Sequence, residues 1–179
     1  MKRLFAALLL ASCAAAPSGS DAGVPDAGSG LTAFQEAVLS AHNAVRAGAM
    51  PVPDPALTGM HWSATAQALA EDWAARCDFN HRDPNTLGEN LFASTSDDGP
   101  TAVVNGWAAE RANFNWTMNT CAIGRQCGHY TQIVWRSSVG VGCASQRCTT
   151  GSPFSSSTTW FFFVCDYDPA GNYLGQKPY

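Results

Sequence analysis

The chain has 179 residues, a formal net charge of −4 and 46% hydrophobic residues, which is enough for one ordinary globular domain. Its ten lysines and arginines are scattered and form no basic stripe, which argues against nucleic acid as a partner. The sequence contains no internal repeat.

The first segment is predicted to be an export signal. Met1-Lys2-Arg3 is basic, and the apolar run from Leu4 to Ala11 is about half as long as a membrane-spanning helix. The sequence Leu10-Ala11-Ser12-Cys13 resembles a bacterial lipobox, which implies a signal peptide over residues 1–12 and acylation of the Cys13 sulfur. The alternative is an ordinary signal-peptide cut after Ala14-Ala15-Ala16.

Residues 13–30 are predicted to form a flexible tether. After Cys13 they consist of Ala, Ser, Gly, Pro and Asp with a single valine. Such a segment buries too little apolar surface to offset the entropy of ordering it. The folded domain is therefore expected over residues 31–179. Without Lys2 and Arg3, eight basic residues face fourteen acidic ones, so the exported chain has a net charge of −6.

The first predicted helix runs from Thr32 to Ala47. Thr32 and Gln35 have the spacing of a capping box, and the apolar residues that follow recur at helical spacing. The polar residues on this helix are interpreted as a face that anchors neighbouring elements; they are His42, Asn43 and Arg46.

Two more helices are predicted, from Ser63 to Arg76 and from Pro100 or Thr101 to Ala112. The first is rich in alanine and carries Trp73 on the side that we expect to face the core. In the second, Trp107 and Glu110 are three residues apart and therefore share a face.

The segment His129–Trp135 fits either a strand or a short helix on periodicity alone. The run Trp160–Cys165 does not alternate between apolar and polar residues, so we expect a strand that is buried on both faces. The full set of predicted extended segments is Leu57–Trp62, Leu87–Phe92, Val139–Cys148 and Trp160–Cys165.

Six cysteines remain once Cys13 is set aside. An even number of cysteines in an exported chain indicates a disulfide framework, and the absence of a close Cys-x-x-Cys pair disfavours a zinc site. Six cysteines allow fifteen pairings, and composition does not choose among them. They are Cys77, Cys121, Cys127, Cys143, Cys148 and Cys165.

Two long motifs resemble a known family. Gly128–Trp135 resembles the first signature of the CAP superfamily, which comprises cysteine-rich secretory proteins, antigen 5 and pathogenesis-related type 1 proteins. Phe162–Tyr173 resembles the second signature, although Asp166 stands where family members usually have Asn or a similar residue. The closing residues 175–179 resemble the plant pathogenesis-related members, and the resemblance covers roughly residues 31–179.

The resemblance implies an α+β fold, a three-layer α-β-α sandwich around a small, mostly antiparallel sheet. It implies that Tyr130–Trp135 forms a short helix. It also implies the disulfide pairing, which is Cys77–Cys148, Cys121–Cys127 and Cys143–Cys165.

The resemblance further implies a central cleft that contains His81, Glu89, Glu110 and His129, all of which this chain has. Two neutral imidazoles can bind a divalent cation such as zinc, but weakly, because catalytic zinc sites have three protein ligands. Nearby carboxylates can orient an imidazole, bind the ion through water or act as a base. The alternative is a hydrogen-bonded network without metal.

Catalysis receives little support from the motifs. The chain contains neither a Gly-x-Ser-x-Gly elbow nor a His-Glu-x-x-His helix, and the six cysteines are expected in disulfides. A metal-dependent hydrolase with Glu89 or Glu110 as its base is therefore the alternative function.

The resemblance instead favours non-enzymatic binding, because several CAP lineages bind sterols, fatty acids or other lipids. The candidate contacts are apolar residues in two otherwise polar loops, and the alternative is that they anchor those loops to the core. We expect a monomer that is exported and either anchored to the cell envelope or secreted; a structural envelope module is a third possibility. The apolar candidates are Phe114, Trp116, Met118 and Phe154.

Overall fold

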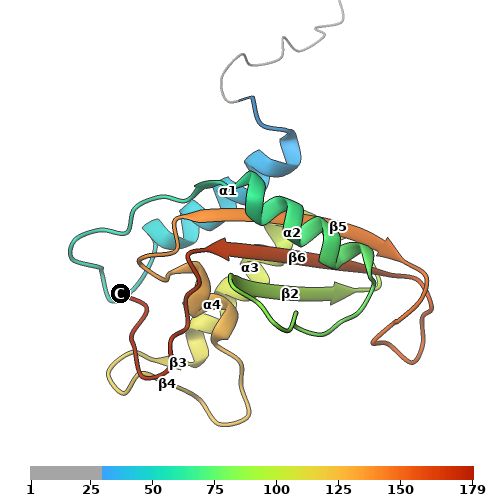
Figure 1. Ribbon diagram of the computed structural model, residues 1–179. Coiled ribbons are helices and arrows are strands. Elements are labelled where there is room, and N and C mark those ends of the chain that lie inside the picture. Colours follow the sequence, from blue (N-terminus) through green and yellow to red (C-terminus); the bar gives the residue numbers. More distant parts are fainter. Residues whose placement is uncertain (1–29) are drawn as a thin grey trace, which may run out of the picture. The chain divides into compact units, whose positions relative to one another are not determined.

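The computed structural model describes residues 30–179, so the predicted signal peptide, Cys13 and the tether lie outside the described residues. The residues Leu31–Tyr179 form one compact unit, which contains all the helices, strands and disulfides described below. A sheet lies in the middle of this unit, with helix α2 on one face and α1, α3 and α4 on the other (Figure 1). This is the expected three-layer α-β-α sandwich.

The sheet has four strands in the order β1-β5-β6-β2. β1 pairs in parallel with β5, and the other two pairings are antiparallel, which confirms a mostly antiparallel sheet. The strands are β1 (His61–Trp62), β5 (Gly140–Cys148), β6 (Trp160–Asp168) and β2 (Gly88–Ser94).

The aromatic strand β6 is central and is buried on both faces, as its sequence predicts. Because side chains alternate along a strand, its even-numbered apolar residues pack toward α2 and its odd-numbered ones toward α1 and α3. The first set is Trp160, Phe162 and Val164, which lie in a core with Trp73. The second set is Phe163, Cys165 and Tyr167, which lie in a core with Val38 and Trp107.

The helices on the two faces are α1 (Ala33–Ala47), α2 (Ala64–Ala75) and α3 (Gly99–Ala109). The predicted capping box is present at the start of α1: the Thr32 amide donates to Gln35 Oε1 at 2.8 Å, and the Gln35 amide donates to Thr32 Oγ1 at 3.3 Å.

α2 lies unusually close to β5. A Cβ atom added to Gly142 would lie 2.0 Å from the backbone nitrogen of Gln67, so no side chain fits at this position.

The segment that was ambiguous on periodicity is a short helix, α4 (Gly128–Ile133), as the family resemblance implies. The third helix ends earlier than predicted, because a 3-10 turn η1 (Glu110–Asn113) replaces its last turn. The predicted loop after it contains strand β3 (Phe114–Asn115), which pairs with β4 (Thr120–Cys121) as a small hairpin.

All three implied disulfides are present. Cys77–Cys148 joins the end of α2 to the end of β5, and Cys143–Cys165 links the neighbouring strands β5 and β6. Cys121–Cys127 closes the short connection between β4 and α4. Helix α4 is thus attached covalently to the hairpin at its N-terminal end.

The polar face of α1 anchors its neighbours, as interpreted from the sequence. His42 is fully buried between the Val38 carbonyl oxygen, at 2.8 Å, and the Tyr167 hydroxyl, at 2.9 Å. Burial lowers the His42 pKa to about 4, so this imidazole stays neutral. Asn43 bonds the backbone of Met60 through both its amide nitrogen and its oxygen.

Among residues 30–179, no helix is both long enough and apolar enough to cross a membrane.

Candidate functional site

The first half of the site is a hydrogen-bonded pair of His129 and Glu110. His129 is the second residue of α4, and Glu110 begins the 3-10 turn that follows α3. The imidazole Nδ1 donates to Glu110 Oε1 at 2.6 Å, and the backbone amides of His129 and Tyr130 donate to Glu110 Oε2 at 3.0 and 3.2 Å. One carboxylate therefore fixes both the ring and the start of its helix.

Two further contacts hold His129 in place. Trp107, one turn before Glu110, stacks on the imidazole with ring centroids 5.7 Å apart and planes at 20°. At the other end of α4, the guanidinium of Arg46 donates to the carbonyl oxygens of Ile133 and Trp135, both at 2.8 Å. A carboxylate at the N-terminus and a cation at the C-terminus both complement the helix dipole.

The second half of the site is a pair of His81 and Glu89. His81 lies in the irregular segment between α2 and β2, and Glu89 is the second residue of β2. The His81 Nδ1 donates to Glu89 Oε1 at 2.7 Å, and this hydrogen bond raises the pKa of His81 above its usual value. The Glu89 side chain is 2% exposed and that of His81 is 65% exposed, so the imidazole faces solvent from a buried carboxylate.

Arg82 bridges Glu89 to a second buried carboxylate. Its guanidinium lies 2.6 Å from Asp166 Oδ2 and 3.3 Å from Glu89 Oε2, and its backbone amide donates to Glu89 Oε1 at 3.1 Å. Asp166 is fully buried, and burial raises its pKa to about 6 despite the opposing effect of Arg82.

The Arg82 cluster has unsatisfied groups. Within residues 30–179, Asp166 Oδ1 and Arg82 Nε have no hydrogen-bond partner. Asp166, the residue that departs from the family signature, is thus connected to the His81–Glu89 pair through Arg82.

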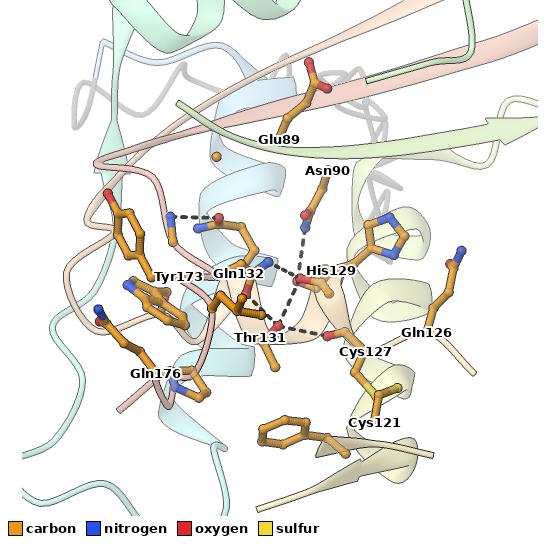
Figure 2. A pocket seen from close by; sticks show the side chains of 18 of the residues that line it. Glu89, Asn90, Cys121, Gln126, Cys127, His129, Thr131, Gln132, Tyr173 and Gln176 are labelled. Atoms are coloured by element: carbon orange, nitrogen blue, oxygen red, sulfur yellow. Dashed lines mark hydrogen bonds between the residues drawn. A yellow bond between two sulfur atoms is a disulfide. The ribbon is translucent and has the colours of Figure 1, made fainter. Parts of the chain in front are cut away.

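A cavity of about 760 Å³ is lined by residues from both pairs. His81, Glu89 and His129 line it, whereas Glu110 reaches it only through His129. Figure 2 shows His129 beside Asn90 and Gln132, with Gln126 and Cys121 on one side of the cavity and Tyr173 and Gln176 on the other. The structure thus arranges the four predicted residues as two separate His–Glu pairs, and three of the four residues line one cavity. Figure 2 shows the Glu89 side chain pointing away from His129.

The four residues do not form a complete metal cage. Among the described residues, no group of three or more His, Cys, Asp or Glu side chains is arranged to hold a metal ion. Each imidazole instead uses Nδ1 for its glutamate, which places the proton there and leaves Nε2 with its lone pair. This is the carboxylate–histidine arrangement found behind metal-bound imidazoles, so the donor chemistry fits a cation with two protein ligands.

Several residues of the cleft were not assigned a role from the sequence. Asn90 is buried and donates to the carbonyl oxygen of His129 and to the Tyr167 hydroxyl, at 3.1 and 3.0 Å. Gln132 donates to Ser138 and accepts from the Gly171 amide. Gln132 lies inside the first signature, one helical turn after His129, and Asn90 directly follows the candidate residue Glu89; these positions were the available signals.

The loop candidates lie in two separate places. Phe114 lines the cleft and contacts Trp116, which in turn stacks on Tyr179 with ring centroids 4.1 Å apart. Met118 is 69% exposed in the same hairpin. Phe154 packs against the core beneath α2, near Trp160 at the end of β6 away from Asp166 and the cleft.

Comparison with known proteins is consistent with this fold. Residues 39–167 match the model of the "Cysteine-rich secretory protein family", CAP. The chain is 39% identical over 145 residues to "Pathogenesis-related leaf protein 4" of Solanum lycopersicum, covering 79% of this chain and 80% of that protein.

Two solved structures share the fold. The Schistosoma mansoni venom allergen-like protein 4 superposes with a TM-score of 0.65 at 25% identity, covering 83% of this chain and 95% of that one. A crystal structure of NaASP2 with Zn2+ superposes with a TM-score of 0.63 at 25% identity, covering 88% and 90%.

Proposed function

Because the chain belongs to the cysteine-rich secretory protein (CAP) family, we propose that it is an exported, non-enzymatic binding protein whose cleft holds a divalent cation such as zinc between His81 and His129. The observation that carries this proposal is the pair of carboxylate-oriented imidazoles on the walls of one cavity. The similar structure described with Zn2+ supports the choice of ion.

The two glutamates act as orienting groups. A carboxylate that accepts the Nδ1 proton fixes the tautomer and makes Nε2 a better donor to a cation. Glu110 is occupied by three hydrogen bonds and Glu89 by contacts with His81 and Arg82. Neither has the free geometry of a general base, so binding is favoured over a metal-dependent hydrolase.

Two imidazoles leave open coordination positions. A cation bound in this way is held weakly by the protein and completes its shell with water or with atoms of a ligand. The cleft is therefore proposed to bind a ligand through the cation on one side and through its polar wall on the other.

A lipid or other apolar ligand is the second candidate. The mouth of the cleft carries Phe114, Tyr173 and Leu174, and the latter two are exposed. Apolar side chains that line an accessible cavity are typical of sites for partly apolar molecules.

Calorimetric titration of residues 31–179 with zinc tests the main proposal. The wild type is expected to bind with an affinity near the micromolar range, equivalent to about −8 kcal/mol, and His81→Ala/His129→Ala is expected to bind at least tenfold more weakly. His61→Ala is the matched control, because His61 is an exposed histidine on β1 that does not line the cleft.

Three outcomes are informative. Loss of binding in the double variant alone supports the metal site. Equal loss in His61→Ala, or no binding by the wild type, would overturn it and make the two pairs a purely structural network. Displacement of a fluorescent fatty acid from the zinc-free protein would favour the second candidate.

A further inference from the structure

The segments on the two sides of the cleft, residues 111–128 and 169–179, carry exposed aliphatic side chains; each is called a bank of the cleft below. On one bank, the turn after β4 contains Ile123, and on the other bank the C-terminal segment contains Leu174; both are fully exposed. The adjoining residues Arg125 and Gln176 line the cavity between them. Two large aliphatic side chains at full exposure are thus carried by segments on either side of one cavity.

The banks are tied together, so this surface is a single unit. The Asn119 side-chain amide donates to the Gln176 carbonyl oxygen at 3.1 Å, and the ring of Trp116 stacks on Tyr179. Met118, 69% exposed, lies between Trp116 and Asn119 on the same hairpin. In Figure 1 the red C-terminal segment runs beside the β3–β4 hairpin.

The charged side chains of these segments have one sign. Residues 111–128 and 169–179 contain no aspartate or glutamate, although the whole chain has fourteen. They contain Arg111, Arg125 and Lys177, and the Lys177 ammonium lies 5.3 Å from the centre of the Trp116 ring. In an acidic chain, the two segments that carry Ile123 and Leu174 thus contain basic residues and no acidic side chain.

We propose that this surface, defined by Met118, Ile123, Leu174, Arg125 and Lys177, docks on an anionic lipid bilayer. Exposed aliphatic side chains flanked by basic residues match a membrane interface, where the apolar groups enter the acyl boundary and the cations meet the headgroups. This proposal goes beyond cation binding and does not depend on it. Docking would place the open mouth of the cleft against the bilayer.

Vesicle co-sedimentation of residues 31–179 tests the proposal, because this unit contains all the described elements and disulfides and lacks Cys13. The probes are vesicles of phosphatidylcholine alone and of phosphatidylcholine with roughly 30% phosphatidylglycerol. The wild type is expected to bind the anionic vesicles at least tenfold more tightly. Ile123→Asp/Leu174→Asp is expected to lose this binding, and Arg125→Gln/Lys177→Gln to weaken it about fivefold per residue.

The matched control is Ala68→Asp/Ala75→Asp, which adds the same charge to the exposed face of α2. Its vesicle binding is expected to stay within about twofold of the wild type, because α2 covers the opposite face of the sheet. Equal loss in the control would mean that overall charge, not this surface, governs binding.

Absence of wild-type binding to anionic vesicles would also overturn docking. The same holds if the protein extracts single lipid molecules but does not remain on the vesicle. His81→Ala/His129→Ala should bind vesicles like the wild type, so failure of the metal proposal and failure of docking remain distinguishable. All variants are compared after their urea unfolding midpoints have been measured.

Discussion

Glu110 accepts hydrogen bonds from both the imidazole Nδ1 and the backbone amide of His129, at 2.6 and 3.0 Å. A single carboxylate therefore determines the tautomer of the ring and caps the helix that carries it. The same geometry makes the site and the fold depend on one another, which the following predictions use.

Glu110→Gln should weaken zinc binding and destabilise the domain together. Loss of a carboxylate behind a ligating histidine typically lowers metal affinity 10- to 100-fold, and a poorer cap on two amides should lower the free energy of unfolding by about 1–3 kcal/mol. Calorimetry and urea denaturation measure the two effects. Glu71→Gln, on the exposed side of α2, is the control and should change neither. Unchanged zinc affinity in Glu110→Gln would contradict the orienting role.

Zinc affinity should fall as the pH is lowered, and the decrease should begin at a higher pH than it would if His81 had the pKa of an ordinary histidine. A cation needs the neutral imidazole, and the hydrogen bond with Glu89 raises the pKa of His81 above 6.5. Titrations at a series of pH values should show the decrease beginning above that value. Glu89→Gln should move the decrease to lower pH, because the raising contact is lost. A profile that is identical in both proteins would show that His81 does not control binding.

Asp166 should make the domain less stable as the pH rises. Its pKa in the folded state is about 6, above its ordinary value of 3.8, so the folded state holds the proton more tightly than the unfolded state. The resulting stabilisation is complete below pH 3.8 and is lost as the pH rises through 6, with a total of about 3 kcal/mol.

The Asp166→Asn variant isolates this effect. Its free energy of unfolding, measured in urea with EDTA present, should lack the component that decreases between pH 3.8 and 6 in the wild type. The variant should therefore become more stable relative to the wild type as the pH increases. A constant difference over this range would rule out titration of Asp166 as the cause.

Arg46→Lys should be strongly destabilising although it keeps the charge. The Arg46 guanidinium donates to the carbonyl oxygens of Thr58, Ile133 and Trp135 at 2.8 Å each, and the residue is 1% exposed. A lysine ammonium cannot reproduce the planar arrangement of donors in the guanidinium, so at least one buried carbonyl oxygen loses its partner. The free energy of unfolding should fall by about 2–4 kcal/mol. Urea denaturation measures the change. Arg76→Lys, whose partner is the exposed Asp72, should change stability by less than about 1 kcal/mol.

Regular elements were predictable where local chemistry determines them. The capping box at Thr32 defines the start of α1, and the aromatic run from Trp160 indicates a buried strand; both are confirmed. The helix α4 was not predictable from periodicity, because six residues are too few to separate the periods of a helix and a strand. The family signature supplied the answer, together with the disulfide pairing.

The cleft was predictable only in part. The sequence and the family resemblance identify the two histidines and two glutamates, yet they do not show that each histidine is paired with a different glutamate. The Arg82 bridge between Glu89 and Asp166 was not predictable either, because it depends on the antiparallel register that places Glu89 opposite Asp166. Such contacts arise from tertiary packing and leave no local pattern.

Helix α4 is held from both ends, by Glu110 at its first residues and by Arg46 at its last. A helix of six residues has almost no stability of its own, so its amide protons should exchange with solvent only when the whole domain unfolds. His129 would then keep its position at every temperature below the melting transition. His81, exposed on an irregular segment, lacks this protection, so the two sides of the cleft differ in how often they open.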